Sequence, residues 1–362
     1  MLSKFLLALC LFLGACVESE ARIPLSGPAD YYVEPGGVDT PTCTTAANPC
    51  ATLQYPFSYV QQNYDLNGQT LTVHAAHGTY PVGILIYGGF VGQSTPWQVN
   101  LVGDAANPKA VVIQPLSSYC IGFGFNAMLQ VSGIECDQSH NTSTYPLLGQ
   151  DSFNGGWGGQ LWFDHVVFGD NLNPFNDIST FGAGTVVVAN GPYTISKTWK
   201  VTSGSWAAGS NFITLASCSD AIANVTPIAP GIPDRTIIMN CNPANGLTQI
   251  NNYTTAAENN TSVGLSWGGN AHLSISTGSM FFDNTNCGNP PFTVTIENQP
   301  AYYQAFVTAF DGGIMNLGVT WGGSSIIHGY QYEADMNGVI RGCGLSVPGT
   351  SPGIVKRGGQ EW

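Results

Sequence analysis

The chain has 362 residues, of which 43% are apolar and only 9% are charged. Its length allows one large repetitive fold or two ordinary domains, and its low charge argues against long amphipathic helices with charged faces. The formal net charge is −13 with nine Lys and Arg in total, which excludes a basic surface for nucleic acid. An acidic surface also repels polyanionic glycans unless a cation intervenes.

Residues 1–21 predict an export signal. Lys4 precedes an apolar run, from Phe5 to Leu13, that is too short to span a membrane as a mature helix. The run ends at Gly14-Ala15-Cys16, which resembles a bacterial lipoprotein signal with Cys16 as the lipidated residue. Plain secretion with cleavage nearby is the alternative. Either way, the expected location is outside the cytoplasm: extracellular, anchored to the outer membrane by lipid, or in a virion.

The cysteines predict disulfides rather than a metal site. With Cys10 in the leader and Cys16 assigned to lipid, an even number remains, and exported chains commonly pair such cysteines. The sequence has no C-x-x-C motif, which would have suggested a zinc site. The candidate pairs are Cys43 with Cys50, Cys120 with Cys136, and Cys218 with Cys241.

The N-terminal region carries the first recognisable motif. Residues 31–39 read YYVEPGGVD, residues 48–54 read NPCATLQ, and residues 78–80 read GTY. This resembles the opening of right-handed β-helix proteins of the pectin-lyase-like class. Between these motifs, residues 51–63 carry Leu53, Phe57 and Val60 at helical spacing, which predicts a helix that caps the open end of a solenoid.

Short strands then recur in pairs. Residues 129–131 and 134–136 alternate apolar and other side chains around a two-residue corner, and 161–163 with 166–168 repeat the pattern. Strands of period two that turn sharply and resume are typical of β-helix rungs. A β-sandwich is the alternative, which the opening motif disfavours. We therefore predict an all-β, right-handed parallel β-helix over residues 30–202 and 266–362.

Residues 203–265 interrupt this rhythm and predict an inserted small β module. Residues 209–215 read GSNFITL and residues 230–238 read PGIPDRTII. The segment resembles a small Gly-rich module of bacteriophage and prophage virion proteins.

The C-terminal region resembles the ending of β-helix proteins in alphaproteobacterial genomes and their prophages. Residues 329–340 read GYQYEADMNGVI, and the chain closes on GGQ at 358–360. Together these resemblances imply a phage tail-spike-like protein or a bacterial relative, and tail spikes of this shape imply a homotrimer. The export signal departs from that pattern and favours a cell-surface or secreted relative.

The stretch WFDHVVF at 162–168 resembles the WIDHxxF segment of pectate lyases. That resemblance implies proton abstraction by a positively charged base together with calcium, but no Arg or Lys is evidently placed to serve Asp164. The alternative interpretation makes Asp164 and His165 a polar corner, with Phe163 and Val166 pointing inward.

Carboxylates and aromatic rings supply the remaining candidates. Glu135 and Asp137 lie two apart on a predicted strand and point to one face, where Asp164 and then Asp170 would follow on the next rung. Paired carboxylates suit glycoside hydrolysis or a calcium ion. Aromatic rings can stack on sugars. The candidate catalytic residues are therefore Glu135, Asp137 and Asp164, and the candidate ligand-binding residues are Trp157, Trp162, His165 and Asp170.

Two functions follow from these candidates. The favoured one is a non-enzymatic surface that binds bacterial or extracellular polysaccharide, without a resident cofactor and with membrane contact only through a lipid anchor. The alternative is a polysaccharide lyase or glycoside hydrolase.

Overall fold

The computed structural model describes residues 22–116, 118–138, 151–171, 176–189, 191–197, 271–283, 293–298, 305–323, 327, 330–342, 346–349 and 352–362, together with the backbone of five strands between residues 204 and 266. At Asp170, Asn171, Lys197 and Asn298 only the backbone is described. The export signal predicted at residues 1–21 lies outside the described residues.

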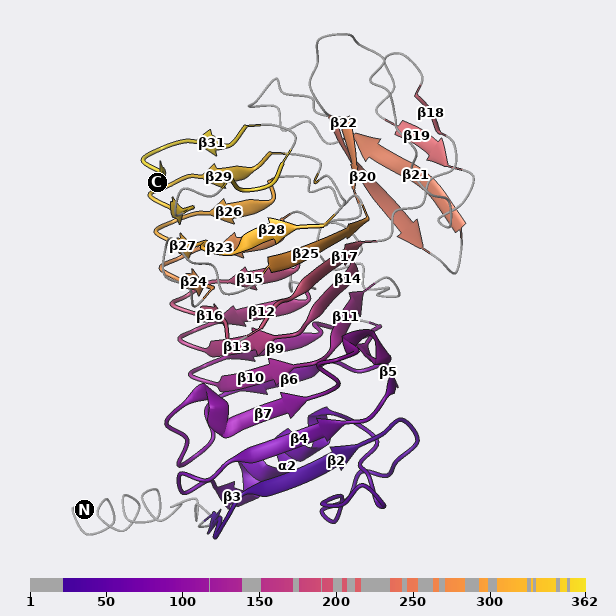
Figure 1. Ribbon diagram of the computed structural model, residues 1–362, viewed down its shortest axis with the longest axis vertical. Coiled ribbons are helices and arrows are strands. Elements are labelled where there is room, and N and C mark those ends of the chain that lie inside the picture. Colours follow the sequence, from indigo (N-terminus) through magenta and orange to yellow (C-terminus); the bar gives the residue numbers. More distant parts are fainter. Residues whose placement is uncertain are drawn as a thin grey trace, which may run out of the picture.

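Most of the described chain forms three parallel sheets that run along one long axis (Figure 1). The ten-stranded sheet has the order β2 (Ala29–Val33), β4 (Leu71–Ala75), β7 (Val99–Val102), β10 (Met128–Ser132), β13 (Gln160–Asp164), β16 (Thr185–Val188), β24 (Met280–Phe282), β27 (Ile314–Asn316), β30 (Val339–Arg341) and β32 (Gln360–Glu361).

The other two long sheets are built in the same way. The seven-stranded sheet runs β5 (Gly78–Tyr80), β8 (Val111–Ile113), β11 (Glu135–Gln138), β14 (Val167–Asn171), β17 (Thr194–Lys197), β25 (Thr293–Asn298) and β28 (Thr320–Gly322). The eight-stranded sheet runs β6 (Ile84–Tyr87), β9 (Ile121–Gly124), β12 (Phe153–Gly156), β15 (Ile178–Thr180), β23 (Leu273–Ile275), β26 (Val307–Ala309), β29 (Tyr332–Ala334) and β31 (Ile354–Val355).

From β7 to β17 the chain visits the ten-, seven- and eight-stranded sheets in turn, one strand in each, and β23 to β30 continue the cycle. One such circuit is called a coil below. Each strand pairs in parallel with its counterpart in the next coil, as β10 does with β13 in an unbroken register from Met128↔Gln160 to Ser132↔Asp164. This mostly β, parallel solenoid is consistent with the predicted β-helix.

The remaining described strands form two smaller sheets. A five-stranded sheet comprises β18 (Gly204–Trp206), β19 (Phe212–Leu215), β20 (Arg235–Asn242), β21 (Gly246–Asn252) and β22 (Val263–Ser266), and it is antiparallel except for the pairing of β20 with β22. β1 (Ile23–Pro24) pairs in parallel with β3 (Tyr64–Asp65). The module boundaries predicted at 203 and 265 remain a prediction.

Helices are few and short among the described residues. The helix α2 (Gln54–Asn63) begins three residues after the predicted start at Ala51, and it buries Phe57 and Val60. The 3-10 helices are η1 (Pro96–Gln98) and η2 (Pro108–Ala110). None of the described helices is long and apolar enough to cross a membrane.

The core lies inside the coils, where side chains of equal register stack from coil to coil. One inward row of the ten-stranded sheet consists of Leu129, Leu161, Val186, Phe281, Met315 and Ile340, each at most 1% exposed. Burying each of these side chains contributes about 1.5–3 kcal/mol. Alternation turns their neighbours in each strand outward. Not all outward positions reach solvent, since β9 and β26 are buried along their whole length.

Two disulfides fasten the N-terminal half. Cys43 pairs with Cys50, and Cys120 pairs with Cys136 across neighbouring coils. Cys218 and the side chain of Cys241 lie outside the described residues. Because structural disulfides persist in oxidising compartments, these two bonds indicate a location outside the cytoplasm.

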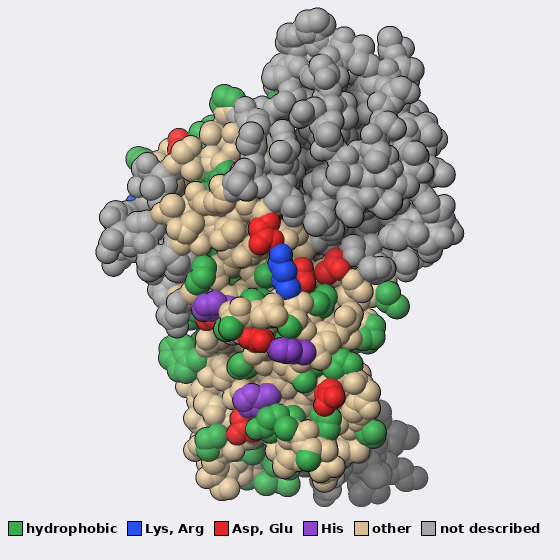
Figure 2. Space-filling model, turned by 45° about the vertical axis from the view of Figure 1, so that its right-hand side comes forward, with side chains coloured by type: hydrophobic (Ala, Val, Ile, Leu, Met, Phe, Trp, Pro, Cys, Tyr) green, Lys and Arg blue, Asp and Glu red, His purple; other side chains and the backbone are tan. Residues whose placement is uncertain are grey.

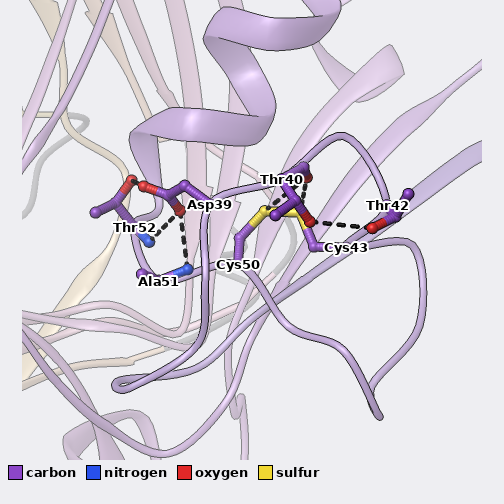
Figure 3. The surroundings of a disulfide bond; sticks show 7 residues. All are labelled: Asp39, Thr40, Thr42, Cys43, Cys50, Ala51 and Thr52. Atoms are coloured by element: carbon purple, nitrogen blue, oxygen red, sulfur yellow. Dashed lines mark hydrogen bonds between the residues drawn. A yellow bond between two sulfur atoms is a disulfide. The ribbon is translucent and has the colours of Figure 1, made fainter.

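The opening motif surrounds the first disulfide (Figure 3). Asp39 Oδ1 accepts the N–H groups of Ala51 and Thr52 at 2.8 and 2.9 Å, and Thr52 Oγ1 donates to Asp39 Oδ2 at 2.8 Å. Gly37 passes so close to Cys50 that an added Cβ would lie 2.4 Å from its carbonyl oxygen. The Gly and Asp of the motif thus hold the loop against the segment that leads into α2.

Candidate functional site

The predicted site residues lie on three different parts of the solenoid surface. Glu135 and Asp137 lie on the outer face of the seven-stranded sheet. Asp164 is the last residue of β13, on the outer face of the ten-stranded sheet, where the chain turns toward the seven-stranded sheet. Trp157 lies just after β12, at the corner between the eight-stranded and ten-stranded sheets. The described geometry therefore separates Asp164 from the other two carboxylates by a corner of the coil.

Glu135 and Asp137 point the same way, as the period of the strand requires. Both lie against Gly169 of the next coil, where an added Cβ would be 3.2 Å from Glu135 Oε1 and 3.3 Å from Asp137 Cβ. Gln114 Nε2 donates to Asp137 Oδ2 at 2.5 Å. The missing side chain at Gly169 leaves room for both acids.

Lys109 is a cation on this sheet that the sequence did not single out. It extends from η2 to Glu297 Oε2 on β25 at 2.5 Å and donates to Ser196 Oγ on β17 at 3.3 Å. Partial burial raises the pKa of Glu297, but the hydrogen bonds from Lys109 and Ser196 outweigh it and leave the pKa lowered. No sequence signal pairs residues 188 apart, because only the folded coils bring them together.

Asp164 and His165 form a polar corner, and Phe163 and Val166 on either side are fully buried. Asp164 Oδ1 accepts hydrogen bonds from Ser132 Oγ at 2.6 Å and from His165 Nδ1 at 2.8 Å. The side chain of Asp164 is 10% exposed and that of His165 is 36% exposed. Figure 2 shows histidine and acidic side chains side by side on one face of the molecule.

An aromatic stripe, defined here as Tyr87, Phe125, Trp157 and Phe181, follows the corner between the eight- and ten-stranded sheets over four successive coils. Successive ring centroids are 5.9, 6.1 and 5.9 Å apart, and Phe125 and Trp157 are stacked at 9°. Trp157 is 58% exposed, Phe125 55% and Tyr87 49%. The stripe is a row of aromatic rings that runs along the solenoid, and three of its four members are exposed to solvent.

Trp162 belongs to a second aromatic pair. It lies on the outer face of β13, half-buried, with its ring 5.6 Å from that of Trp97. Asp170 lies on β14, but its side chain is outside the described residues.

Another Asp–His pair lies inside the coils. Asp177 Oδ2 contacts His272 Nδ1 at 2.8 Å, and His272 Nε2 contacts the Tyr193 hydroxyl at 3.1 Å. Asp177 and His272 are fully buried, and burial raises the pKa of Tyr193 well above its usual value. Since no solvent reaches this group, we assign it to the packing of the core.

Within the described residues, no three His, Cys, Asp or Glu side chains gather closely enough to hold a metal ion. A shallow hollow of about 500 Å³ lies beside the first disulfide, and it is lined by loop residues between Glu34 and Pro49, none of them among the predicted site residues. The calcium ion that the sequence suggests at the carboxylates of Glu135, Asp137 and Asp164 therefore stays a prediction.

Comparison with family models, curated proteins and solved structures finds no match to this chain. Any functional assignment therefore depends on the surface geometry itself.

Proposed function

We propose that this protein is an exported parallel β-helix surface protein that binds polysaccharide along its aromatic stripe. The observation that carries the proposal is the unbroken line of rings over four coils, in which Tyr87, Phe125 and Trp157 are exposed and Phe181 is partly buried. Aromatic faces stack against the apolar faces of sugars, and a line of them suits an extended chain better than a single small ligand.

Three finer parts of the proposal concern architecture. We propose that the solenoid is right-handed, as nearly all such crossover connections are. We also propose that α2 caps its N-terminal end, because the helix buries Phe57 and Val60 beneath the first coils. The five-stranded sheet between β17 and β23 is proposed as an inserted module, since its strands pair with one another rather than with the long sheets.

We also propose that the protein is of the tail-spike type, that it forms a trimer and that it carries an export signal. These proposals are supported by the motifs at both ends of the solenoid and by the oxidising location that the two disulfides indicate.

The charge of the protein limits the class of polysaccharide that it can bind. With a formal net charge of −13, the surface repels polyanions, so we propose a neutral or weakly charged polysaccharide. A ring that is 58% exposed makes few contacts within the protein, so truncating Trp157 removes binding surface at little cost to the fold.

The test is affinity electrophoresis of the full-length chain through gels that contain individual bacterial exopolysaccharides. Wild type is expected to be retarded by at least one neutral polymer, and Trp157→Ala to bind it about tenfold less tightly, which corresponds to about 1.4 kcal/mol. Trp362→Ala is the matched control, because Trp362 is also an exposed tryptophan but lies just after β32, away from the stripe.

Equal retardation of wild type and Trp157→Ala would remove the stripe as the binding surface. If the polymer is instead shortened, and Glu135→Gln abolishes the shortening, the protein is a hydrolase or lyase rather than a binding protein.

A further inference from the structure

The orientation of His165 differs from that of the other exposed histidines described. His74 and His77 direct Nε2 at their aspartates, Asp30 and Asp104, at 2.8 and 2.9 Å. His165 instead directs Nδ1 at Asp164. Its Nε2 is therefore the nitrogen that is left to face away from the carboxylate, on a side chain that solvent reaches.

The carboxylate that holds His165 is itself fixed. Asp164 is buried and accepts a second hydrogen bond, from Ser132 of the preceding coil. A buried carboxylate on Nδ1 keeps the proton of the neutral imidazole on that nitrogen, so Nε2 carries the lone pair. This is the arrangement by which an aspartate orients a catalytic histidine as a base.

The backbone also holds the ring in place at a cost. His165 has a φ of 49°, in the left-handed region where β-carbons are crowded, and its N–H donates to the Pro192 carbonyl at 2.7 Å. The preceding coil has Gly133, with a φ of 70°, at the same corner. Gly191 backs the imidazole so closely that an added Cβ would lie 2.2 Å from Cε1. The backbone hydrogen bond and the close contact with Gly191 fix the direction of the imidazole.

We propose that His165 and Asp164 form a general-base site for hydrolysis of carboxylic esters, the class to which the O-acyl groups of polysaccharides belong. Imidazole accepts a proton at neutral pH, which suits attack of water on an ester, whereas glycosidic cleavage needs two carboxyl groups. Trp162 lies two residues before Asp164 on the same outer face, with Trp97 against it, and offers a surface for the sugar.

The reaction balances without a cofactor. His165 Nε2 takes a proton from water as its oxygen bonds to the ester carbonyl carbon. The tetrahedral intermediate then breaks the bond to the alcohol oxygen, and the imidazolium returns the proton to that oxygen, which yields one acid and one alcohol. Asp164 touches the imidazole and not the substrate, so it is a positioning residue, as is Ser132.

The proposal goes beyond polysaccharide binding and does not depend on the aromatic stripe. The probe is p-nitrophenyl acetate, which is too small to need the stripe, with the full-length chain as catalyst. General-base catalysis contributes about 10²–10⁴-fold, so we expect His165→Gly and Asp164→Asn to lose at least tenfold in rate. His77→Gln is the control for ester cleavage by any exposed imidazole.

His165→Gly should fold at least as well as wild type, because glycine already occupies the equivalent corner at Gly133. A second readout is independent of activity: long-range ¹H–¹⁵N spectra should show the proton of neutral His165 on Nδ1, and Asp164→Asn should shift it. The proposal is wrong if His165→Gly cleaves the probe at the wild-type rate, or if the proton resides on Nε2 in wild type.

Discussion

Left-handed residues at the corners decide which side chains the solenoid displays. At the corner that leads into the ten-stranded sheet, Phe125, Trp157, Thr277, Asp311 and Met336 all have φ between 46° and 53°. Each is followed by Gly or Asn, also at positive φ, which those residues adopt with least strain. The first residue of the pair is exposed in every case, so the corner can change its chemistry without disturbing the core.

Asp151 is a single residue at which pH and stability are coupled. Burial raises its pKa to about 6, although the Asn176 N–H at 2.5 Å and the Asn154 amide at 3.1 Å both favour the charged form. An unfolded aspartate titrates near pH 4. Between about pH 4 and pH 6 the folded chain therefore holds a proton that the unfolded chain has released, and stability falls as pH rises through this range.

We expect Asp151→Asn to remove this loss. The free energy of unfolding of the variant, relative to that of wild type, should rise by about 2 kcal/mol from pH 4.5 to pH 7. Urea unfolding at both pH values measures it. Asp311→Asn is the control, because it makes the same substitution at an exposed aspartate. A gain for Asp151→Asn that is the same at both pH values would contradict the assignment.

The strands could be predicted from the sequence better than the surface that they build. The alternation at 129–131 and 134–136 corresponds to β10 and β11, because burial on one side of a strand imposes a period of two. The aromatic stripe was seen in the sequence only at Trp157. Its members are unevenly spaced along the chain, since the connections between coils differ in length, and stacking is visible only in three dimensions.

Glycines in β12 are another feature set by neighbouring coils rather than by local sequence. Gly155 faces inward, and a Cβ there would lie 2.0–2.5 Å from ring atoms of the buried Phe123. We expect Gly155→Ala to destabilise the protein by at least about 2 kcal/mol, because overpacking a close-packed core strains it. Thermal unfolding measures this, with Gly27→Ala as the control, since nothing lies within 4 Å of its added Cβ.

The double variant Phe123→Leu/Gly155→Ala tests the cause. If the clash explains the loss, the smaller side chain relieves it, and the double variant is less destabilised than the sum of the two single variants. Additive losses would mean that backbone effects at Gly155 dominate.

The two ends of the solenoid differ in what covers them. A coil stacks only on its neighbours, so an end coil depends on whatever covers it. At the N-terminal end, Tyr59 of α2 contacts Tyr31 of β2 with ring centroids 6.4 Å apart, and the Cys43–Cys50 bond closes the adjoining loop. At the other end, β31 and β32 have two residues each, and Gln360 and Glu361 are exposed.

This asymmetry predicts the order in which backbone amides exchange with deuterium. Amides of β31 and β32 should exchange first, those of β2 and β4 much later, and those of β10, β13 and β16 last, because the central coils have neighbours on both sides. Hydrogen exchange followed by mass spectrometry resolves these peptides. Substituting Tyr59 with Ala removes the ring contact with Tyr31 and should speed exchange in β2 and β4, while β31 and β32 stay unchanged. If β2 exchanged as fast as β32 in wild type, α2 would not protect its end of the solenoid.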